Sequence, residues 1–144
     1  MKTRETWIFC LVLGMALLMP SCGKKGPPFL PKEPFDVRVR DLRGEAKEGS
    51  VFLKGQVVGT KEGDSVQGAR VDYAQYPVDE PPCDGCPIQY RGSYNFGPEV
   101  ITETGFYCEA PVDLRGQLCF FRVYLIGPDD AVGPVSNTVR VVVD

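Results

Sequence analysis

The sequence predicts an all-β fold, a two-sheet sandwich that follows a signal segment and a proline-rich linker. Apolar and polar residues alternate over much of residues 35–144, as they do in half-buried strands. Gly, Pro, Asp and Asn separate these runs, which is typical of short antiparallel strands. About seven strands in a segment of this length favour two packed sheets.

Residues 1–21 have the layout of a secretory signal peptide. Lys2 and Arg4 precede an apolar run from Trp7 to Met19. The run is shorter than the roughly 20 apolar residues that cross a bilayer. We therefore expect the segment to direct export and to be removed afterwards.

The residues that follow resemble the lipobox of bacterial lipoproteins, which here reads Leu18-Met19-Pro20-Ser21-Cys22. The resemblance implies cleavage before Cys22 and lipidation of its thiol with diacylglycerol, with an acyl chain such as palmitate on the freed amine. Two or three such chains hold a protein to a membrane essentially permanently. Gly23 stands where the family's inner-membrane retention signal has Asp, so the resemblance implies the periplasmic face of the outer membrane. The alternative is an ordinary secreted protein that is cut nearby.

Residues 22–34 form the lipidated N-terminus and a linker that contains four prolines. Proline fixes φ and favours an extended polyproline conformation, so the linker is expected to be a semi-rigid spacer. Its first part, Cys22-Gly23-Lys24-Lys25-Gly26-Pro27-Pro28, also resembles the start of small lipoproteins that contact the lipopolysaccharide translocon. That resemblance implies a translocon-associated lipoprotein as an alternative function.

The net charge of the mature chain disfavours two kinds of partner. Removing Lys2, Arg4 and Glu5 from 16 basic and 19 acidic residues leaves 14 and 18, a net charge of −4. This balance argues against nucleic acid as a partner and against electrostatic adhesion to anionic lipid. The expected link to the membrane is therefore the covalent lipid.

Six segments carry the strand pattern of the expected domain, residues 35–144. Their alternating apolar positions fall within residues 37–42, 51–57, 71–76, 106–108, 119–125 and 139–143. None of these segments has sustained helical spacing with a cap. All six are therefore predicted to be strands.

The cysteines remaining after cleavage are odd in number. Cys22 carries the lipid in this interpretation, which leaves Cys83, Cys86, Cys108 and Cys119 to form disulfides in an oxidising compartment. Four cysteines allow three connectivities. Zinc is disfavoured because the second pair is widely spaced and the chain has no histidine. A redox dithiol is disfavoured because no helix follows Cys86 to lower the thiol pKa.

Residues 35–144 resemble a fibronectin type III domain, most closely where they match the last third of that domain. The resemblance rests on Leu114, on residues 119–123 (Cys-Phe-Phe-Arg-Val) and on residues 133–137 (Gly-Pro-Val-Ser-Asn). It implies a fibronectin type III or immunoglobulin-like sandwich. Gly55 stands where strand B of the family has its core Trp, and Cys119 stands where strand F has a Tyr whose hydroxyl ties down the E–F corner.

The second departure suggests how the cysteines pair. In the frame of the family, Cys108 on strand E and Cys119 on strand F share the inward phase, so we expect a disulfide between them to replace the tyrosine. Cys83 and Cys86 would then pair with each other as a local clip. Bonds between the two pairs remain the alternative.

The expected function is that of a non-catalytic module. Without histidine the chain lacks the usual general base and most transition-metal ligands, so neither an enzyme nor a cofactor or metal is predicted. Tyr90, Tyr94 and Phe96, in the long connection from Val78 to Pro98, are candidate binding residues. They are equally interpretable as core residues. We expect an envelope protein as the partner, with carbohydrate binding as the alternative.

Overall fold

A computed structural model describes residues 34–59, 65–103, 105–112 and 115–144 of the chain. The signal segment, Cys22, most of the linker and Leu114 lie outside the described residues. The account below concerns the compact unit that spans Glu33–Asp144.

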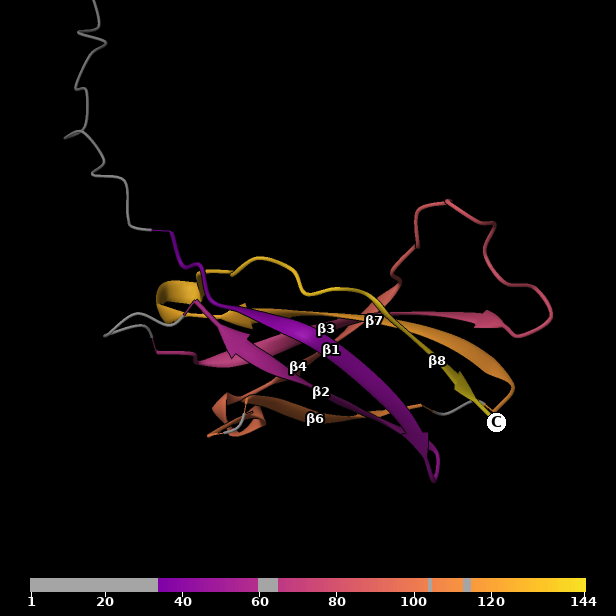
Figure 1. Ribbon diagram of the computed structural model, residues 1–144, viewed down its shortest axis with the longest axis horizontal. Helices are drawn as coiled ribbons and strands as arrows, with labels where there is room; N and C mark the ends of the chain where they lie inside the picture. The colour runs from indigo at the N-terminus through magenta and orange to yellow at the C-terminus, as the bar shows by residue number, and fades with distance from the viewer. Residues whose placement is uncertain (1–33, 60–64, 104, 113–114) are drawn as a thin grey trace, which may run out of the picture. The chain divides into compact units, whose positions relative to one another are not determined.

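Two four-stranded antiparallel sheets make up this unit (Figure 1). Sheet A has the order β1 (Arg38–Lys47), β2 (Ser50–Val58), β6 (Gly105–Pro111) and β5 (Ile101–Thr102). Sheet B has the order β4 (Gly92–Phe96), β3 (Gly68–Pro77), β7 (Gln117–Ile126) and β8 (Val139–Val143). If the eight strands are lettered A, B, C, C′, D, E, F and G along the chain, the sheets have the orders A–B–E–D and C′–C–F–G, which is the arrangement of an immunoglobulin-like sandwich. The predicted fold class is confirmed.

Short 3₁₀ turns are the only helical elements among the described residues. They are η1 (Pro98–Val100) and η2 (Pro128–Asp130). No helix in this part of the chain is long and apolar enough to cross a bilayer.

The core lies between the sheets and follows the period-two pattern of the sequence. On β7 the buried residues Cys119, Phe121, Val123 and Leu125 alternate with partly exposed ones. They meet side chains from sheet A, among them the buried Phe106. Burying one large apolar side chain contributes about 1.5–3 kcal/mol. This shared core fixes the two sheets against each other, so the side chains on their outer faces have defined positions.

Gly55, where the resemblance to fibronectin type III domains leads us to expect a missing core tryptophan, lies against neighbouring side chains. A Cβ atom built on Gly55 would overlap Val39 Cγ1 and lie 2.9 Å from Arg40 O. Val39, which is 1% exposed, therefore fills this part of the core. Close packing of β1 against β2 takes the place of a large aromatic ring.

The two predicted disulfides have different outcomes. Cys83 and Cys86 are bonded, with their Cα atoms 5.3 Å apart, which confirms the local clip. Cys108 and Cys119 are buried free thiols, so the predicted bond between them is wrong. Their residues do point inward, but from opposite sheets. Facing sheets pack about 10 Å apart on average, so a disulfide between them needs two positions at which the Cα atoms approach to about 4.4–6.8 Å, as at the B–F disulfide of antibody domains. Cys108 and Cys119 are unbonded and do not form such a pair.

A tyrosine from another strand ties down the corner between β6 and β7. The Tyr94 hydroxyl, on β4, donates a hydrogen bond of 2.7 Å to Pro111 O. At the start of β7, Gly116 N donates to Val143 O at 2.7 Å. Two hydrogen bonds, one from Tyr94 on β4 and one to Val143 on β8, therefore fix the corner that we expected a disulfide to fix.

Candidate interaction site

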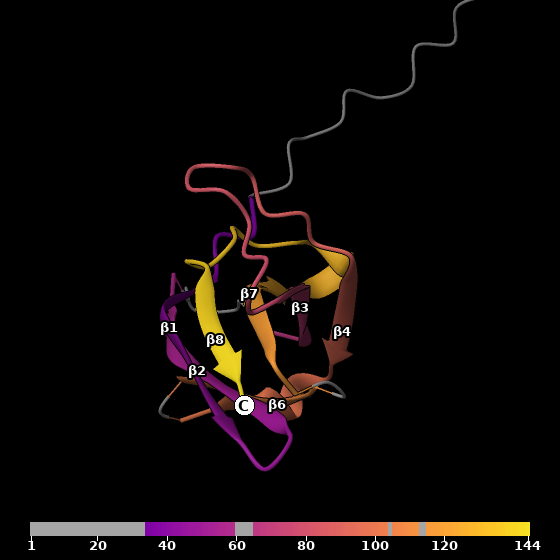
Figure 2. The ribbon, with the colours of Figure 1, turned by 90° about the vertical axis from the view of Figure 1, so that its right-hand side faces the viewer.

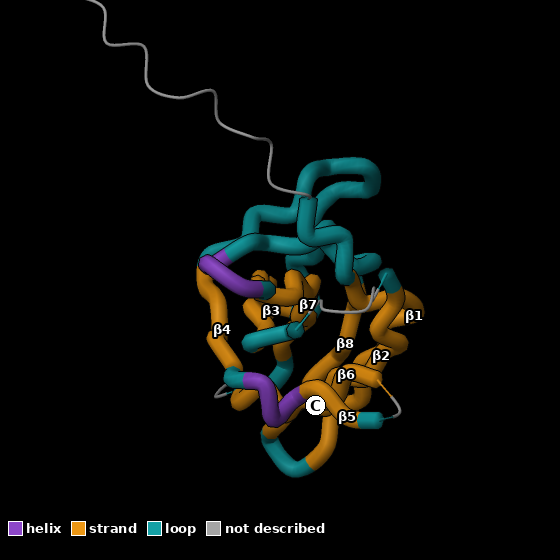
Figure 3. Tube along the Cα trace, turned by 90° about the vertical axis from the view of Figure 1, so that its left-hand side faces the viewer, coloured by secondary structure: helices purple, strands orange, loops and turns teal. Residues whose placement is uncertain are grey.

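The connection between β3 and β4 contains a projecting loop, residues 78–91, which we call the clipped loop. Figures 2 and 3 show it extending beyond the ends of the strands. Its residues 78–87 are exposed apart from the half-buried Pro82. Asp79, Glu80 and Asp84 give this projection a negative charge, and Pro81, Pro82 and Pro87 restrict its backbone.

The tip of the clipped loop is a closed turn. Cys86 N donates a hydrogen bond of 3.0 Å to Cys83 O, and the disulfide joins the same two residues. Gly85 has a φ of +79°, the left-handed region required at the third position of a type II turn. The Cys-Asp-Gly-Cys sequence thus forms a turn locked by both a hydrogen bond and a covalent bond.

Both ends of the clipped loop are fastened to sheet B. Val78 N donates to Gly116 O at 3.3 Å. On the other side, Gln89 N donates to the Tyr76 hydroxyl oxygen at 3.1 Å, and Arg91 N donates to Tyr73 O at 3.1 Å. Only the clipped tip therefore stands free of the sheet.

A charged cluster on the outer face of sheet B supports this loop. Asp72 and Arg122 are direct neighbours across β3 and β7. The Arg122 Nε and Nη2 atoms lie 3.1 Å and 3.0 Å from Asp72 Oδ2. Arg70 Nε lies 3.1 Å from Asp72 Oδ1, an ion pair in which this N–H makes no hydrogen bond. Two guanidinium groups share one carboxylate, so this Arg–Asp cluster keeps an excess positive charge.

Aromatic rings cover that charge. The Arg122 guanidinium carbon lies 3.9 Å from the centre of the Tyr90 ring, and that of Arg70 lies 4.8 Å from the Tyr124 ring. Such cation–π contacts contribute about 0.5–2 kcal/mol. The Tyr90 hydroxyl is also 3.0 Å from Thr138 Oγ1. Tyr90 thus connects the clipped loop to β7 and to the segment before β8.

The three predicted binding residues do not form one site. Tyr90 lies on the outer face of sheet B, as described. Tyr94 and Phe96 lie on β4 and pack against the core, where the Tyr94 and Tyr73 rings stack with centroids 4.7 Å apart. For these two residues the core interpretation is the correct one.

The Arg–Asp cluster is the part of the site that sequence reasoning missed. Asp72 lies between Val71 and Tyr73, and Arg122 lies between Phe121 and Val123. The sequence indicates the cluster only by placing a charged residue at an outward-facing position of each of two strands. It does not show that these two strands are paired.

The four described cysteines offer no thiolate at neutral pH. Cys83 and Cys86 are bonded to each other and so offer no thiolate. Burial raises the pKa of the Cys108 thiol to about 12, and burial also raises the pKa of Cys119, opposed by a hydrogen bond from Gln75. Both thiols are protonated at neutral pH. No group of three His, Cys, Asp or Glu side chains in the described ranges could hold a metal ion.

Comparison with known proteins assigns no family to the chain. No family model matches the sequence, and no curated protein matches it. One similar solved structure is described as "Myokine structure"; it is 18% identical, and the alignment covers 79% of this chain and 98% of that chain with a TM-score of 0.44. This likeness is too weak to bear on function.

Proposed function

We propose that this protein is a lipid-anchored lipoprotein of the bacterial envelope whose sandwich presents the clipped loop to a protein partner. The loop is the observation that carries the proposal. It is exposed, acidic and closed by a disulfide, while its ends are held by sheet B. The lipobox-like sequence that ends at Cys22 supports the anchor.

A loop that is ordered before binding suits recognition of another protein. Binding costs conformational entropy for each segment that must be ordered, and a preorganised loop avoids that cost. The carboxylates of Asp79, Glu80 and Asp84 favour a partner with a basic surface. We therefore propose a non-catalytic role, in which the partner is an envelope protein with a positively charged groove.

Replacement of Cys22 by alanine tests the anchor. Wild-type protein is expected to be found in the membrane fraction, with an intact mass equal to residues 22–144 plus acyl groups and two hydrogens fewer for one disulfide. Cys22→Ala is expected to carry no lipid and to keep the mass of the uncut chain, because the modified thiol is what the lipoprotein peptidase recognises. Cys10→Ala is the matched control and should behave as wild type. An unmodified wild-type chain would contradict the proposal.

Crosslinking in cells tests the partner. A photoreactive side chain at position 79 or 84 is expected to capture the same envelope protein, because both positions lie on the exposed part of the loop. Glu109, exposed on β6 of the other sheet, is the control position and should give no such adduct. In Cys83→Ser/Cys86→Ser the adduct yield should fall at least threefold, since the tip loses its covalent closure. Identical adducts from positions 79, 84 and 109 would refute a role for the loop.

A further inference from the structure

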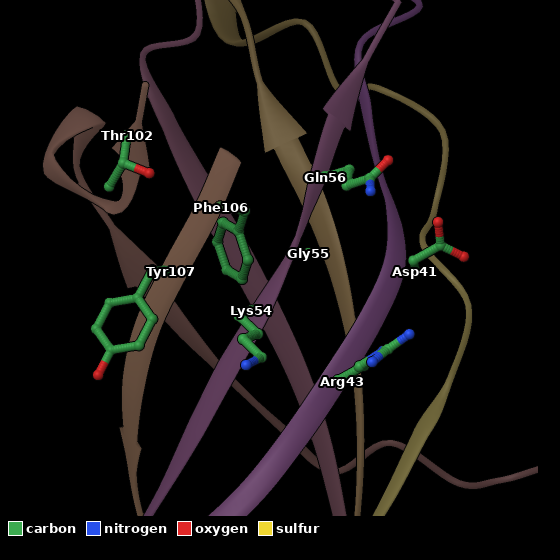
Figure 4. A pocket seen from close by; sticks show the side chains of 8 residues that line it. All are labelled: Asp41, Arg43, Lys54, Gly55, Gln56, Thr102, Phe106 and Tyr107. Carbon is green, nitrogen blue, oxygen red and sulfur yellow. The ribbon is translucent and has the colours of Figure 1, made fainter. Parts of the chain in front are cut away.

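The outer face of sheet A carries a row of three side chains, one from each of three neighbouring strands. Arg43 on β1 is the direct neighbour of Lys54 on β2, and Lys54 is the direct neighbour of Tyr107 on β6. Figure 4 shows these three side chains on neighbouring strands. The row therefore places two cations next to an aromatic ring.

This arrangement is unfavourable for the free protein. Like charges directly opposite on neighbouring strands are destabilising. Among the residues that the structure describes, neither Arg43 nor Lys54 has an ion-pair partner, unlike Arg70 and Arg122, which share Asp72. An anion placed between the two side chains would remove the repulsion.

A β-bulge shapes one end of the row. The register between β1 and β2 shifts between Arg40 and Arg43, and within the bulge Asp41 has a φ of +51°. Bulges of this kind change the direction of nearby side chains and are frequent beside functional sites. Here the bulge brings Asp41 to the rim of an open depression of about 530 Å³ that Lys54, Gln56 and Tyr107 also line.

The other end of the depression is aromatic. Tyr107 is 50% exposed, and its ring stacks on Phe52 with centroids 6.2 Å apart. Phe52 stands in the next row between Glu45 and Glu109. Figure 4 places Tyr107 and Asp41 on opposite sides of Lys54. An exposed ring, two cations, a carboxylate and an amide thus line one shallow surface.

We propose that this depression binds an anionic saccharide. The sugar ring stacks on Tyr107, its phosphate or carboxylate lies between Arg43 and Lys54, and its hydroxyl groups donate to Asp41 and Gln56. An acidic peptide is disfavoured because it would bring further carboxylates close to those of Asp41, Glu45 and Glu109. A sugar is favoured because a carboxylate is a good acceptor for its hydroxyl groups. The site is on the sheet opposite to the clipped loop and does not depend on the proposed protein partner.

Titration of the full-length chain in a nonionic detergent tests this site. The probes are glucose 6-phosphate, glucuronate, glucose, inorganic phosphate and hexaglutamate, followed by backbone amide NMR shifts. We expect saturable binding of glucose 6-phosphate, of glucuronate or of both, with the largest shifts at Arg43, Lys54 and Tyr107. Which of the two binds distinguishes a phosphate from a carboxylate group. Glucose and inorganic phosphate should each bind at least tenfold more weakly.

Variants identify the residues responsible. Arg43→Ser/Lys54→Ser should weaken binding at least tenfold without lowering the thermal midpoint, since the opposed charges are removed. Tyr107→Ala should weaken binding about fivefold, whereas Tyr107→Phe keeps the ring and the affinity. Arg115→Ser/Arg140→Ser removes the same charge from exposed positions elsewhere and should change affinity less than twofold. The proposal is overturned if neither anionic sugar binds, if glucose, phosphate or hexaglutamate binds as tightly, or if the control variant weakens binding equally.

Discussion

Replacement of Asp72 by alanine is expected to lower the free energy of unfolding by about 2 kcal/mol and to release the clipped loop from sheet B. The Asp72 side chain is 10% exposed and is the acceptor for Arg122 and the ion-pair partner of Arg70. Removing one partner of a fully buried ion pair costs about 3–5 kcal/mol. The Arg122 and Arg70 side chains are 32% and 40% exposed, so solvent compensates for part of that loss.

The same change should act on Tyr90. Its ring lies over the guanidinium group that Asp72 holds in place. Without the carboxylate the two arginines repel each other, and Arg122 no longer has a fixed position beneath the ring. We therefore expect faster amide exchange at Gln89 and Arg91, which donate the hydrogen bonds at that end of the loop.

Urea denaturation of the full-length chain, followed by circular dichroism, measures the stability change. Urea is preferred to guanidinium chloride because it leaves the ion pairs unscreened. Asp72→Asn keeps the shape of the side chain and one acceptor oxygen, so its effect should be intermediate. Glu109→Ala, at an exposed position of β6, should change stability by less than about 0.5 kcal/mol. If Asp72→Ala were equally mild and left amide exchange at Gln89 and Arg91 unchanged, the Arg–Asp cluster would have no role in holding the loop.

The sequence was sufficient for the strands whose faces differ in polarity. The predicted segments correspond to β1, β2, β3, β6, β7 and β8, because alternate residues in each are buried in the core. The sequence predicts a loop where the structure has β4, because this segment is short and follows a stretch rich in proline. Its Ser-Tyr-Asn-Phe sequence does alternate. β8 is an edge strand of the same length, but it has three buried valines at alternate positions, whereas β4 has only two aromatic residues, both half-buried.

The candidate site was less predictable because it depends on which strands are neighbours. Cys108 and Cys119 do face inward from opposite sheets, as the predicted strands E and F imply, but neither the phase nor the sheet of a residue determines how close two sulfur atoms come. The pairing of Asp72 with Arg122 likewise requires the strand order β4-β3-β7-β8. The Cys83–Cys86 clip was predictable because its partners are three residues apart and need no knowledge of topology.

The buried thiols are expected to make the fold sensitive to alkali. Burial raises the pKa of Cys108 from its ordinary value of 9.0 to about 12. Between these values the thiol of the unfolded chain loses its proton while that of the native protein keeps it. The native state then binds more protons, so stability falls as the pH rises. The loss amounts to at most about 1.4 kcal/mol per pH unit between roughly pH 9 and 12, and the raised pKa of Cys119 acts in the same direction.

Comparing wild type with Cys108→Ala isolates this contribution, because other groups that titrate at high pH are common to both proteins. The variant loses buried volume and should be less stable at pH 7 by about 1 kcal/mol, but its stability should fall less steeply above pH 9. At some alkaline pH the two curves should therefore cross or converge. A disulfide between Cys108 and Cys119 would leave no thiol to titrate. In Cys108→Ala that bond could not form, and Cys119 would remain as a buried thiol with a raised pKa. A steeper fall in stability for the variant than for wild type would therefore contradict the free thiols of the structure and support the bond that the sequence suggested.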